Sequence, residues 1–473
     1  MMMTLAQALQ ALPGATPVGD MGTSVLRVHT DTRSLQRGDL FVALKGEHFD
    51  ANQFLTQAQA RGAAAAICHP GAGLAATGLS GLEVGDTKAA LGALARSWRA
   101  RFTLPLIAVT GSNGKTTVTQ MLAAILQSWK AGAALATEGN LNNDIGVPLT
   151  LLRLRDSHRV AVLELGMNHP GEIAQLAAMA CPTVALVNNA QREHLEFMAT
   201  VEAVARENGA VLSALPADGV AVFPHADAYT GLWRSLAGSR RHWTFALESE
   251  GAAGSADADV VGTSAVWNGR AWSVRTRTPA GELAFRLRIA GRHNVVNALA
   301  AIACALAAGA PPKSILRGLE AFEPVKGRSR AMEITMGKAA ITLVDDSYNA
   351  NPDSVSAALH LLATLPAPRL MVLGDMGEVG EQGEMFHAQA GTQALQLGID
   401  HVFTHGALSL AAARQCTGAR HFDTMNDLIP AVLQQLPATA SVLVKGSRFM
   451  RMERVVEAIT RHAHDLSEET HAA

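Results

Sequence analysis

The chain has 473 residues, which is too long for one ordinary hydrophobic core and favours three domains. Hydrophobic residues make up 48% and charged residues 17%, a composition that is typical of a globular protein and excludes a disordered chain. The formal net charge of −2 excludes a strongly basic nucleic-acid or membrane surface, and no apolar run reaches the roughly 18 residues of a membrane span. Because the N-terminus lacks a basic leader and the four cysteines form no C-x-x-C pair, we expect a cytoplasmic protein with reduced thiols.

Residues 1–85 are predicted to form a small N-terminal α/β domain. Helical and strand-like spacing alternates along it, with helices at Thr4–Leu12 and Gln53–Arg61 and strands at Leu40–Leu44 and Ala63–Cys68. Asp31, Thr32 and Arg33 lie ahead of the first of these strands and bring small polar groups and one guanidinium. This set suits a sugar or nucleotide, but taken alone a solvated loop is the better interpretation.

A glycine-rich loop dominates the second unit, residues 86–322. The predicted strand Leu104–Val109 runs into TGSNGKTT, and the amphipathic helix Val118–Trp129 follows. This order of strand, glycine loop and helix holds nucleotide phosphates, with Lys115 as the positive charge and the Thr116 hydroxyl as a possible Mg²⁺ ligand. The loop departs from the standard G-x-x-x-x-G-K-[ST] pattern because Val109 occupies the first glycine position. The predicted phosphate-binding residues are Gly111, Ser112, Asn113, Gly114, Lys115, Thr116 and Thr117.

The second unit alternates strands and helices, which predicts a mostly parallel sheet with helices on both faces. Further strands are expected at Val160–Leu165, Thr183–Val187 and Gly219–Phe223. Glu164 stands at a strand's carboxyl end, where ligands bind in such sheets, and is placed to bind Mg²⁺ directly or through water. His194 follows the next strand and suits a metal or phosphate site, although a loop histidine without function is equally consistent.

Several asparagines in this unit fit hydrogen bonding to a polar substrate or nucleotide. Asn140, Asn142 and Asn143 lie between two glycines, and turn chemistry is the alternative explanation for them.

From Val260 to Ile289 the hydrophobic period becomes two, with a turn at Asn268-Gly269, which predicts an antiparallel excursion. The helix Val295–Ala308 follows; Asn294 lies near its cap and Asn297 in its first turn, and either could be structural.

Residues 323–473 are predicted to form a second, smaller α/β domain. Its strands are expected at Ile341–Val344, Arg369–Leu373, His401–Thr404 and Ser441–Val444. Asp345, Tyr348, Asn349 and Asn351 follow the first strand, where carboxylates, amides and a ring that can pack on a base indicate a ligand crevice. Two cations and a hydroxyl follow the last strand and could hold a carboxylate or phosphate: Lys445, Ser447 and Arg448. A structural turn and surface cations are the alternatives.

Taken together, these segments resemble the Mur ligases, the ATP-dependent amide ligases of peptidoglycan synthesis, over nearly the whole chain. The resemblance implies a uridine-nucleotide domain at 1–85, an ATP-binding domain at 86–322 and a Rossmann-like domain at 323–473 that binds the incoming amine and part of ATP. It implies catalytic roles for Lys115, Glu164 and His194, with Mg²⁺ held by Thr116, Glu164 and His194. It implies further ATP contacts at Asn294, Asn297, Asp345, Tyr348 and Asn349. It implies substrate contacts at Asp31, Thr32, Arg33, Asn140, Asn142, Asn143, Asn351, Lys445, Ser447 and Arg448.

Within the family, the Tyr-Asn-Ala-Asn-Pro run at 348–352 points to the member that joins D-alanyl-D-alanine to UDP-N-acetylmuramoyl-tripeptide (UDP-MurNAc-tripeptide). The ligase for the third amino acid is expected to carry Asp-Asn-Pro-Arg, which this chain lacks. A folylpolyglutamate synthetase is expected to begin near its ATP loop, so the domain that precedes the loop in this chain argues against that enzyme. A GTPase should show Asn-Lys-x-Asp, and no asparagine here precedes a lysine. A small-molecule kinase stays an alternative if the phosphate loop is considered alone. We expect the protein to be a monomer.

One departure from the family pattern concerns a lysine that such ligases commonly carry as a carbamate in an Ala-Lys-Gly-Glu run. The corresponding run here is Arg206-Glu-Asn-Gly209, so Asn208 occupies the lysine position. A carbamate that bridges two Mg²⁺ ions therefore cannot be carried over to this chain. The neighbouring Glu207 is our candidate for the missing negative charge.

Overall fold

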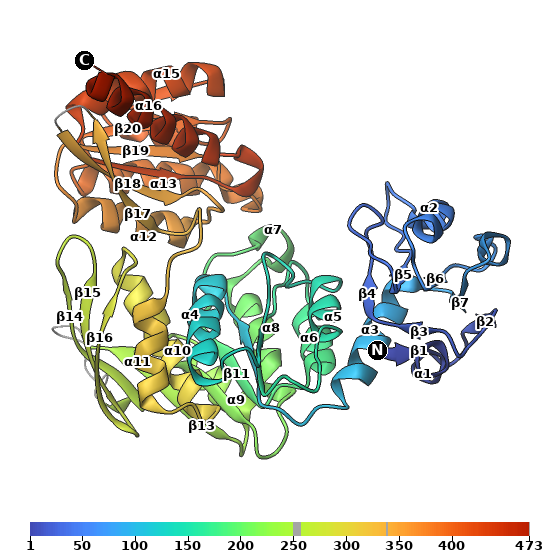
Figure 1. Ribbon diagram of the computed structural model, residues 1–473. Helices are drawn as coiled ribbons and strands as arrows, with labels where there is room; N and C mark the ends of the chain where they lie inside the picture. The colour runs from blue at the N-terminus through green and yellow to red at the C-terminus, as the bar shows by residue number, and fades with distance from the viewer. Residues whose placement is uncertain (249–256, 337–338, 473) are drawn as a thin grey trace.

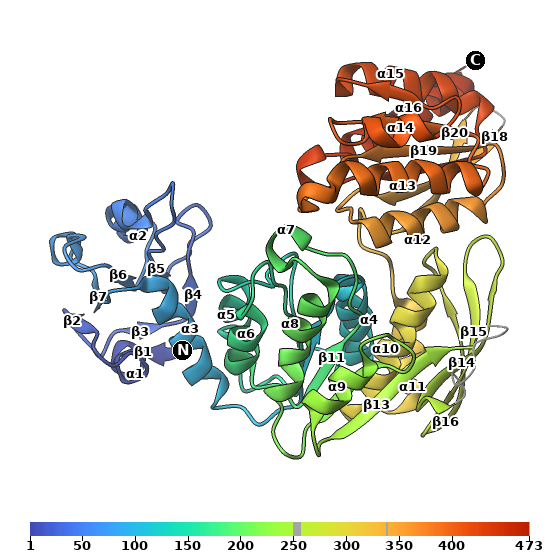
Figure 2. The same cartoon turned by 180° about the vertical axis from the view of Figure 1, so that it is seen from behind.

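The computed structural model describes residues 1–248, 257–336 and 339–472, which form three α/β units in chain order (Figure 1). The C-terminal unit lies over one end of the central unit, and the N-terminal unit is attached beside the central unit through helix α3 (Thr87–Arg99), as Figures 1 and 2 show from opposite sides. The main sheet of each unit is mostly parallel, which confirms the predicted fold class. Among the helices of the described ranges, none has the length and apolar character needed to cross a membrane.

The N-terminal unit is built on a sheet in which a short antiparallel edge strand joins four parallel strands. Its order is β2 (Thr16–Val18), β7 (Ser80–Glu83), β6 (Ala65–Cys68), β5 (Asp39–Val42) and β4 (Arg27–His29). A two-stranded ladder, β1 (Met3–Thr4) with β3 (Ser24–Val25), adjoins helix α1 (Leu5–Ala11). Thr4 closes a capping box on α1, which explains why that helix starts where the sequence predicted. The second helix, α2 (Leu55–Ala60), is preceded by a 3₁₀ turn at Ala51–Phe54.

The central sheet begins as a parallel sheet and ends in an antiparallel extension. In spatial order its strands are β9 (Ala134–Ala136), β10 (Val160–Glu164), β8 (Leu106–Thr110), β11 (Val184–Val187), β12 (Val220–Pro224), β13 (Arg241–Leu247), β14 (Val260–Trp267), β15 (Trp272–Thr278) and β16 (Gly281–Leu287). Strands β14, β15 and β16 pair antiparallel, which confirms the predicted excursion and its turn at Asn268-Gly269. The sequence analysis missed β9 and β13.

Strand β8 lies inside this sheet and is buried on both faces. Leu106 and Ala108 point into one core, and Ile107 and Val109 point into the other. Alternate side chains of a strand face opposite sides, so a strand covered on both sides is a continuous apolar run. One face carries α4 (Lys115–Trp129), α10 (Arg292–Ala307) and α11 (Pro312–Ala321). The other carries α3, α5 (Gly146–Leu151), α6 (Glu172–Ala180), α8 (Val201–Ser213) and α9 (Thr230–Ala237).

The C-terminal unit has one antiparallel edge strand on an otherwise parallel sheet. Its order is β17 (Arg330–Met336), β18 (Ala339–Asp346), β22 (Ser441–Lys445), β19 (Arg369–Gly374), β20 (His401–His405) and β21 (Arg420–Phe422). Its helices are α12 (Pro352–Ala363), α13 (Gly383–Gln396), α14 (Leu410–Gln415), α15 (Met425–Gln435) and α16 (Glu453–Ala472). The carboxyl ends of β18 and β22 meet at one edge of this sheet, and that edge faces the central unit.

Candidate active site

A cavity of about 1100 Å³ opens where the carboxyl ends of the central strands meet the C-terminal unit. Most of the residues selected from the sequence line it: Ser112, Asn113, Gly114, Lys115, Thr116, Thr117, Asn140, Asn142, Asn143, Glu164, His194, Asn294, Asn297, Tyr348, Asn349, Asn351 and Lys445. The cavity therefore gathers loops from two units that lie far apart along the chain. Its position follows the general rule for open α/β sheets, in which ligands bind at the carboxyl ends of the strands.

The phosphate loop joins β8 to α4 through two glycines with positive φ, Gly111 (+131°) and Gly114 (+81°). A side chain at either position would collide with buried amides, since an added Cβ at Gly114 would lie 2.5 Å from Oδ1 of Asn297. Asn188 supports the loop by donating from Nδ2 to the Asn113 carbonyl (2.8 Å) and to Asn297 Oδ1 (2.9 Å). Asn294 in turn accepts a hydrogen bond from Asn297 Nδ2 (2.9 Å). The two α10 asparagines thus hold the loop as well as lining the cavity.

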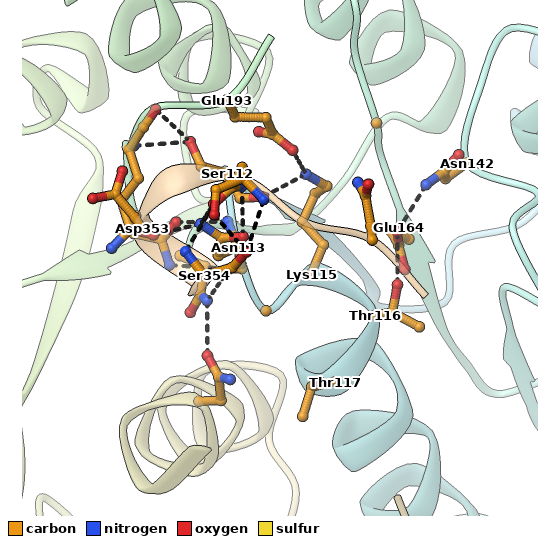
Figure 3. Close-up of a pocket in the computed structure, with 18 of the residues that line it drawn as sticks. Ser112, Asn113, Lys115, Thr116, Thr117, Asn142, Glu164, Glu193, Asp353 and Ser354 are labelled. Atoms are coloured by element: carbon orange, nitrogen blue, oxygen red, sulfur yellow. Dashed lines mark hydrogen bonds and ion pairs between the residues drawn. The ribbon is translucent and has the colours of Figure 1, made fainter. Parts of the chain in front are cut away.

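Lys115 carries the positive charge of the loop, and its ammonium is held by three interactions. Its Nζ donates to the carbonyls of Gly111 (2.6 Å) and Ser112 (3.0 Å) and forms an ion pair with Glu193 Oε1 (2.8 Å; Figure 3). Both charged side chains are largely buried, with 14% of Lys115 and 11% of Glu193 exposed. The sequence analysis missed Glu193, although its place directly before His194 in the same loop was an available signal.

Glu164 lies at the end of β10 beside the first turn of α4. Its Oε1 accepts hydrogen bonds from Thr116 Oγ1 (3.1 Å) and Asn142 Nδ2 (2.8 Å), and both side chains point toward it in Figure 3. Its Oε2 is buried and has no hydrogen-bond partner among the described residues. A buried carboxylate oxygen without a partner is costly unless a cation neutralises it. Carboxylate and hydroxyl oxygens are also what Mg²⁺ prefers, so the residues present fit this ion.

His194 reaches the same cavity but its ring is engaged away from Glu164. Nδ1 lies 2.5 Å from Glu378 Oε2, and Nε2 lies 3.5 Å from Glu193 Oε1. Burial lowers the pKa of His194, but the two carboxylates outweigh burial and raise its pKa to about 9. The described ranges contain no cluster of three or more His, Cys, Asp or Glu side chains that could hold a metal. The structure thus brings Thr116 and Glu164 together, while His194 joins a carboxylate pair that bridges to the C-terminal unit.

The C-terminal unit contacts the phosphate loop directly. The amides of Asn113 and Asn351 exchange hydrogen bonds of 2.9 and 3.3 Å, and Asn351 is also the N-cap of α12. Arg192 binds Asp353 with its guanidinium, at 2.7 Å for the shortest contact. Because these contacts cross from the central unit to residues after β18, movement of either unit changes the geometry of the phosphate loop.

Three predicted contact residues of the C-terminal unit do not line the cavity: Asp345, Ser447 and Arg448. Asp345 is buried and accepts hydrogen bonds from the backbone of Gly327 (2.8 Å) and the hydroxyl of Ser347 (2.6 Å). Its strand neighbour Asp346 faces the cavity instead and pairs with Lys445 (2.7 Å), because successive strand residues point to opposite faces. The prediction for Asp345 is therefore corrected to Asp346.

Ser447 and Arg448 support the site from outside the cavity. The Ser447 hydroxyl accepts a hydrogen bond from the Gly377 backbone (2.6 Å) and donates to the Ala350 carbonyl (3.1 Å), so it joins two loops. Arg448 lies over the Tyr348 ring, with its guanidinium carbon 5.5 Å from the ring centroid. Direct substrate contact is therefore corrected to a supporting role for Ser447, whereas contact by the exposed Arg448 stays a prediction.

The predicted uridine-binding residues lie in the N-terminal unit, away from the cavity lining. Asp31 and Arg33 form a local ion pair of 2.7 Å, in which 87% of the arginine side chain is exposed. Thr32 donates to Oε1 of Gln57 (3.0 Å). Nothing in these contacts requires a ligand, so the nucleotide role of Asp31, Thr32 and Arg33 stays a prediction.

The structure overturns our interpretation of Glu207 as a substitute for a metal-bridging carbamate. Both of its oxygens bind backbone N–H groups at the start of α6, those of Gly171 (2.8 Å) and Ile173 (2.8 Å). A carboxylate at a helix N-terminus satisfies orphan donors and the helix dipole. The neighbouring Asn208 anchors the phosphate loop, because its Oδ1 accepts from Thr110 Oγ1 (2.5 Å) and the Gly111 backbone (3.0 Å).

We expect Glu207→Ala to lower stability without changing the dependence on Mg²⁺. Loss of the cap on α6 should cost about 1–2 kcal/mol of unfolding free energy. Chemical denaturation measures that loss, and titration of ATP hydrolysis with Mg²⁺ measures the metal dependence. A clear rise in the Mg²⁺ concentration needed for half-maximal rate would restore the earlier interpretation.

Comparison with known proteins places this site in a class. Three family models match consecutive parts of the chain: "Mur ligase family, catalytic domain" at residues 25–99, "Mur ligase middle domain" at 109–305 and "Mur ligase, glutamate ligase domain" at 330–448. The chain belongs to the Mur ligase family, as the sequence resemblance indicated.

Individual relatives show which member of the family this chain is similar to. The UDP-N-acetylmuramoyl-tripeptide–D-alanyl-D-alanine ligase of Escherichia coli K12 is 40% identical, and the match covers 96% of this chain and 98% of that protein. A crystal structure of MurF from Acinetobacter baumannii is 35% identical with a TM-score of 0.87 and covers 97% and 98% of the two chains. A structure described as UDP-N-acetylmuramoylalanyl-D-glutamyl-2,6-diaminopimelate–D-alanyl-D-alanyl ligase from the same organism is 34% identical with a TM-score of 0.81, and covers 98% of each chain.

Proposed function

We propose that this chain is the ATP-dependent ligase that joins D-alanyl-D-alanine to UDP-MurNAc-tripeptide. The products are UDP-MurNAc-pentapeptide, ADP and phosphate, and the reaction supplies a peptidoglycan precursor. One observation carries the proposal: the chain is 40% identical to a ligase of that name over 96% of its length. The cavity of the same chain is lined by Lys115, Thr116 and Glu164. We further propose that the enzyme works in the cytoplasm as a monomer.

The chemistry follows from the poor reactivity of a carboxylate toward amines. The terminal carboxylate of the tripeptide attacks the γ-phosphorus of ATP, and the bond between that phosphorus and the bridging oxygen of ADP breaks. The amine of D-alanyl-D-alanine then attacks the acyl phosphate carbon, and a tetrahedral species loses phosphate to give the amide. As in other phosphoryl transfers, the protein contributes position and charge compensation more than covalent chemistry.

Lys115 and the loop amides are the groups of this chain that would receive the γ-phosphate. Transfer of the Lys115 ammonium from Glu193 to the phosphate would bring the positive charge to the oxygens on which negative charge develops. Thr116 and Glu164 would hold Mg²⁺, which supplies charge neutralisation at the phosphates when bound. His194, clamped between Glu193 and Glu378, would position the C-terminal unit against the loop.

Product analysis separates this proposal from the kinase alternative. The enzyme is incubated with ATP, UDP-MurNAc-tripeptide and D-alanyl-D-alanine, and the products are identified by mass spectrometry. We expect equal amounts of ADP, phosphate and the pentapeptide amide. A stable phosphorylated acceptor, formed with or without the dipeptide, would identify a kinase and refute the ligase.

A further inference from the structure

A cluster of mixed charge lines one end of the cavity and was not predicted from the sequence. Lys88 comes from the first turn of α3, Asp144 from the loop before α5, and Glu172 from the start of α6. Lys88 Nζ and Asp144 Oδ2 form an ion pair of 2.7 Å whose side chains are 53% and 46% exposed. The hydrogen bond that Lys88 donates to Asp144 raises the pKa of Lys88, and the charges of Asp144, Asp86 and Glu172 add to this effect. All three charged side chains line the same cavity.

Short loops connect this cluster to the proposed reaction centre. Asp144 follows Asn142 by two residues, so their Cα atoms lie at most about 8 Å apart. The Asn142 amide binds the Glu164 carboxylate at 2.8 Å, and the Asn142 carbonyl accepts from the Gly166 backbone at 2.8 Å. Glu172 is anchored to the loop after β10 that contains Gly166, because its Oε2 accepts from the Asn168 backbone at 2.7 Å. The cluster and the edge where Thr116 and Glu164 meet thus line the same cavity and are joined by the Asn142–Asp144 segment.

The proposed reaction places one part of the substrate beside the reaction centre, within this cavity. The carboxylate to be phosphorylated belongs to the third residue of the tripeptide, so the side chain of that residue starts at the reaction centre. An extended side chain with four carbon–carbon bonds reaches roughly 5 Å, because the bond angles shorten each bond of about 1.5 Å to about 1.25 Å along the chain. The A. baumannii relative is described with 2,6-diaminopimelate as that residue, whose far end carries an ammonium and a carboxylate.

We propose that Lys88, Asp144 and Glu172 form a specificity subsite for a zwitterionic third residue of the acceptor peptide, with Lys88 binding its terminal carboxylate and the two acids its ammonium. This inference rests on the proposed function and adds the substrate class. Exposed ion pairs contribute little to stability, so exchanging the Lys88–Asp144 pair for substrate contacts costs little. A lysine at the third position would set its ammonium beside Lys88 without a compensating carboxylate, which adds a repulsive element to the selection.

The test compares two acceptors that differ only in this terminal carboxylate. UDP-MurNAc-tripeptides ending in meso-diaminopimelate or in L-lysine are assayed for kcat and KM with wild type, Lys88→Gln and the control Lys313→Gln, an exposed lysine on α11 that does not line the cavity. Wild type and the control should prefer diaminopimelate. Lys88→Gln should raise KM for diaminopimelate about fivefold to tenfold and leave kcat within about twofold. It should leave KM for the lysine acceptor equal or lower, because the repulsion from Lys88 is removed. Thermal unfolding verifies that the variants fold.

The outcomes distinguish this inference from the proposed function. Equal losses for both acceptors in Lys88→Gln would overturn the subsite and place Lys88 on a part that the two substrates share. A wild-type preference for lysine would overturn it as well. Failure of wild type to ligate D-alanyl-D-alanine to either acceptor would instead refute the proposed function.

Discussion

Lys115→Ala is expected to abolish ligase turnover, with a loss of at least about 10³-fold in kcat/KM, while the fold survives. The variant removes the ammonium that neutralises the transferring phosphate. It leaves Gly111 and Gly114 to shape the loop, because their conformations are fixed by the amides packed around them. Glu193 loses its cation, so a modest drop in melting temperature should accompany the loss of activity.

The matched control for this change lies at the C-terminal cap of the same helix. Lys130→Ala removes a lysine that follows the other end of α4, where it packs over Trp129, and should keep full activity. Steady-state kinetics, nucleotide titration and circular dichroism together test the prediction. If Lys115→Ala kept turnover within about tenfold of wild type, the loop would not be the site of phosphoryl transfer.

Glu164→Gln should separate activity from stability. The native carboxylate is buried with one oxygen unpartnered, so a neutral amide of the same shape removes an uncompensated charge and should leave the melting temperature equal or higher. Turnover should fall at least about 100-fold, because the amide weakens Mg²⁺ binding beside the phosphates. Binding of Mn²⁺ in the presence of ATP, followed by electron paramagnetic resonance, should weaken in parallel.

An exposed acid provides the control for that experiment. Glu202 pairs with Arg206 on the surface of α8, and Glu202→Gln should change neither metal binding nor turnover. Unchanged metal binding in Glu164→Gln would remove this residue from the metal site. A large loss of stability would show that the unpartnered oxygen is satisfied in some other way.

Local pattern was enough to predict the framework around the cavity. The apolar run of β8 is buried on both faces, and a buried parallel strand must look like this in sequence. The period of two in β15 and β16 likewise indicates strands with one face covered. Helix α4 begins at Lys115, three residues before the predicted Val118, because the loop itself supplies the first turn. Short strands such as β9 carry too little pattern to be recognised.

The errors within the site have a common physical origin. A motif places a polar run at a strand end, but which of two adjacent carboxylates faces the cavity depends on the register of the strand, as Asp345 and Asp346 show. Glu207 sits beside a family metal position in sequence, yet it packs against a helix terminus that only the tertiary structure brings near. Lys88 was missed for the same reason, because only the tertiary structure brings it to the cavity, from a helix that joins two units.

The most direct test of the proposed mechanism traces the oxygen atoms of the tripeptide's terminal carboxylate. UDP-MurNAc-tripeptide labelled with ¹⁸O in its terminal carboxylate is ligated to D-alanyl-D-alanine, and the released phosphate is analysed by mass spectrometry. Attack of that carboxylate on the γ-phosphorus predicts that phosphate carries one carboxylate oxygen for each amide formed. Phosphate without label, or label in AMP with release of pyrophosphate, would contradict activation by the phosphate loop around Lys115.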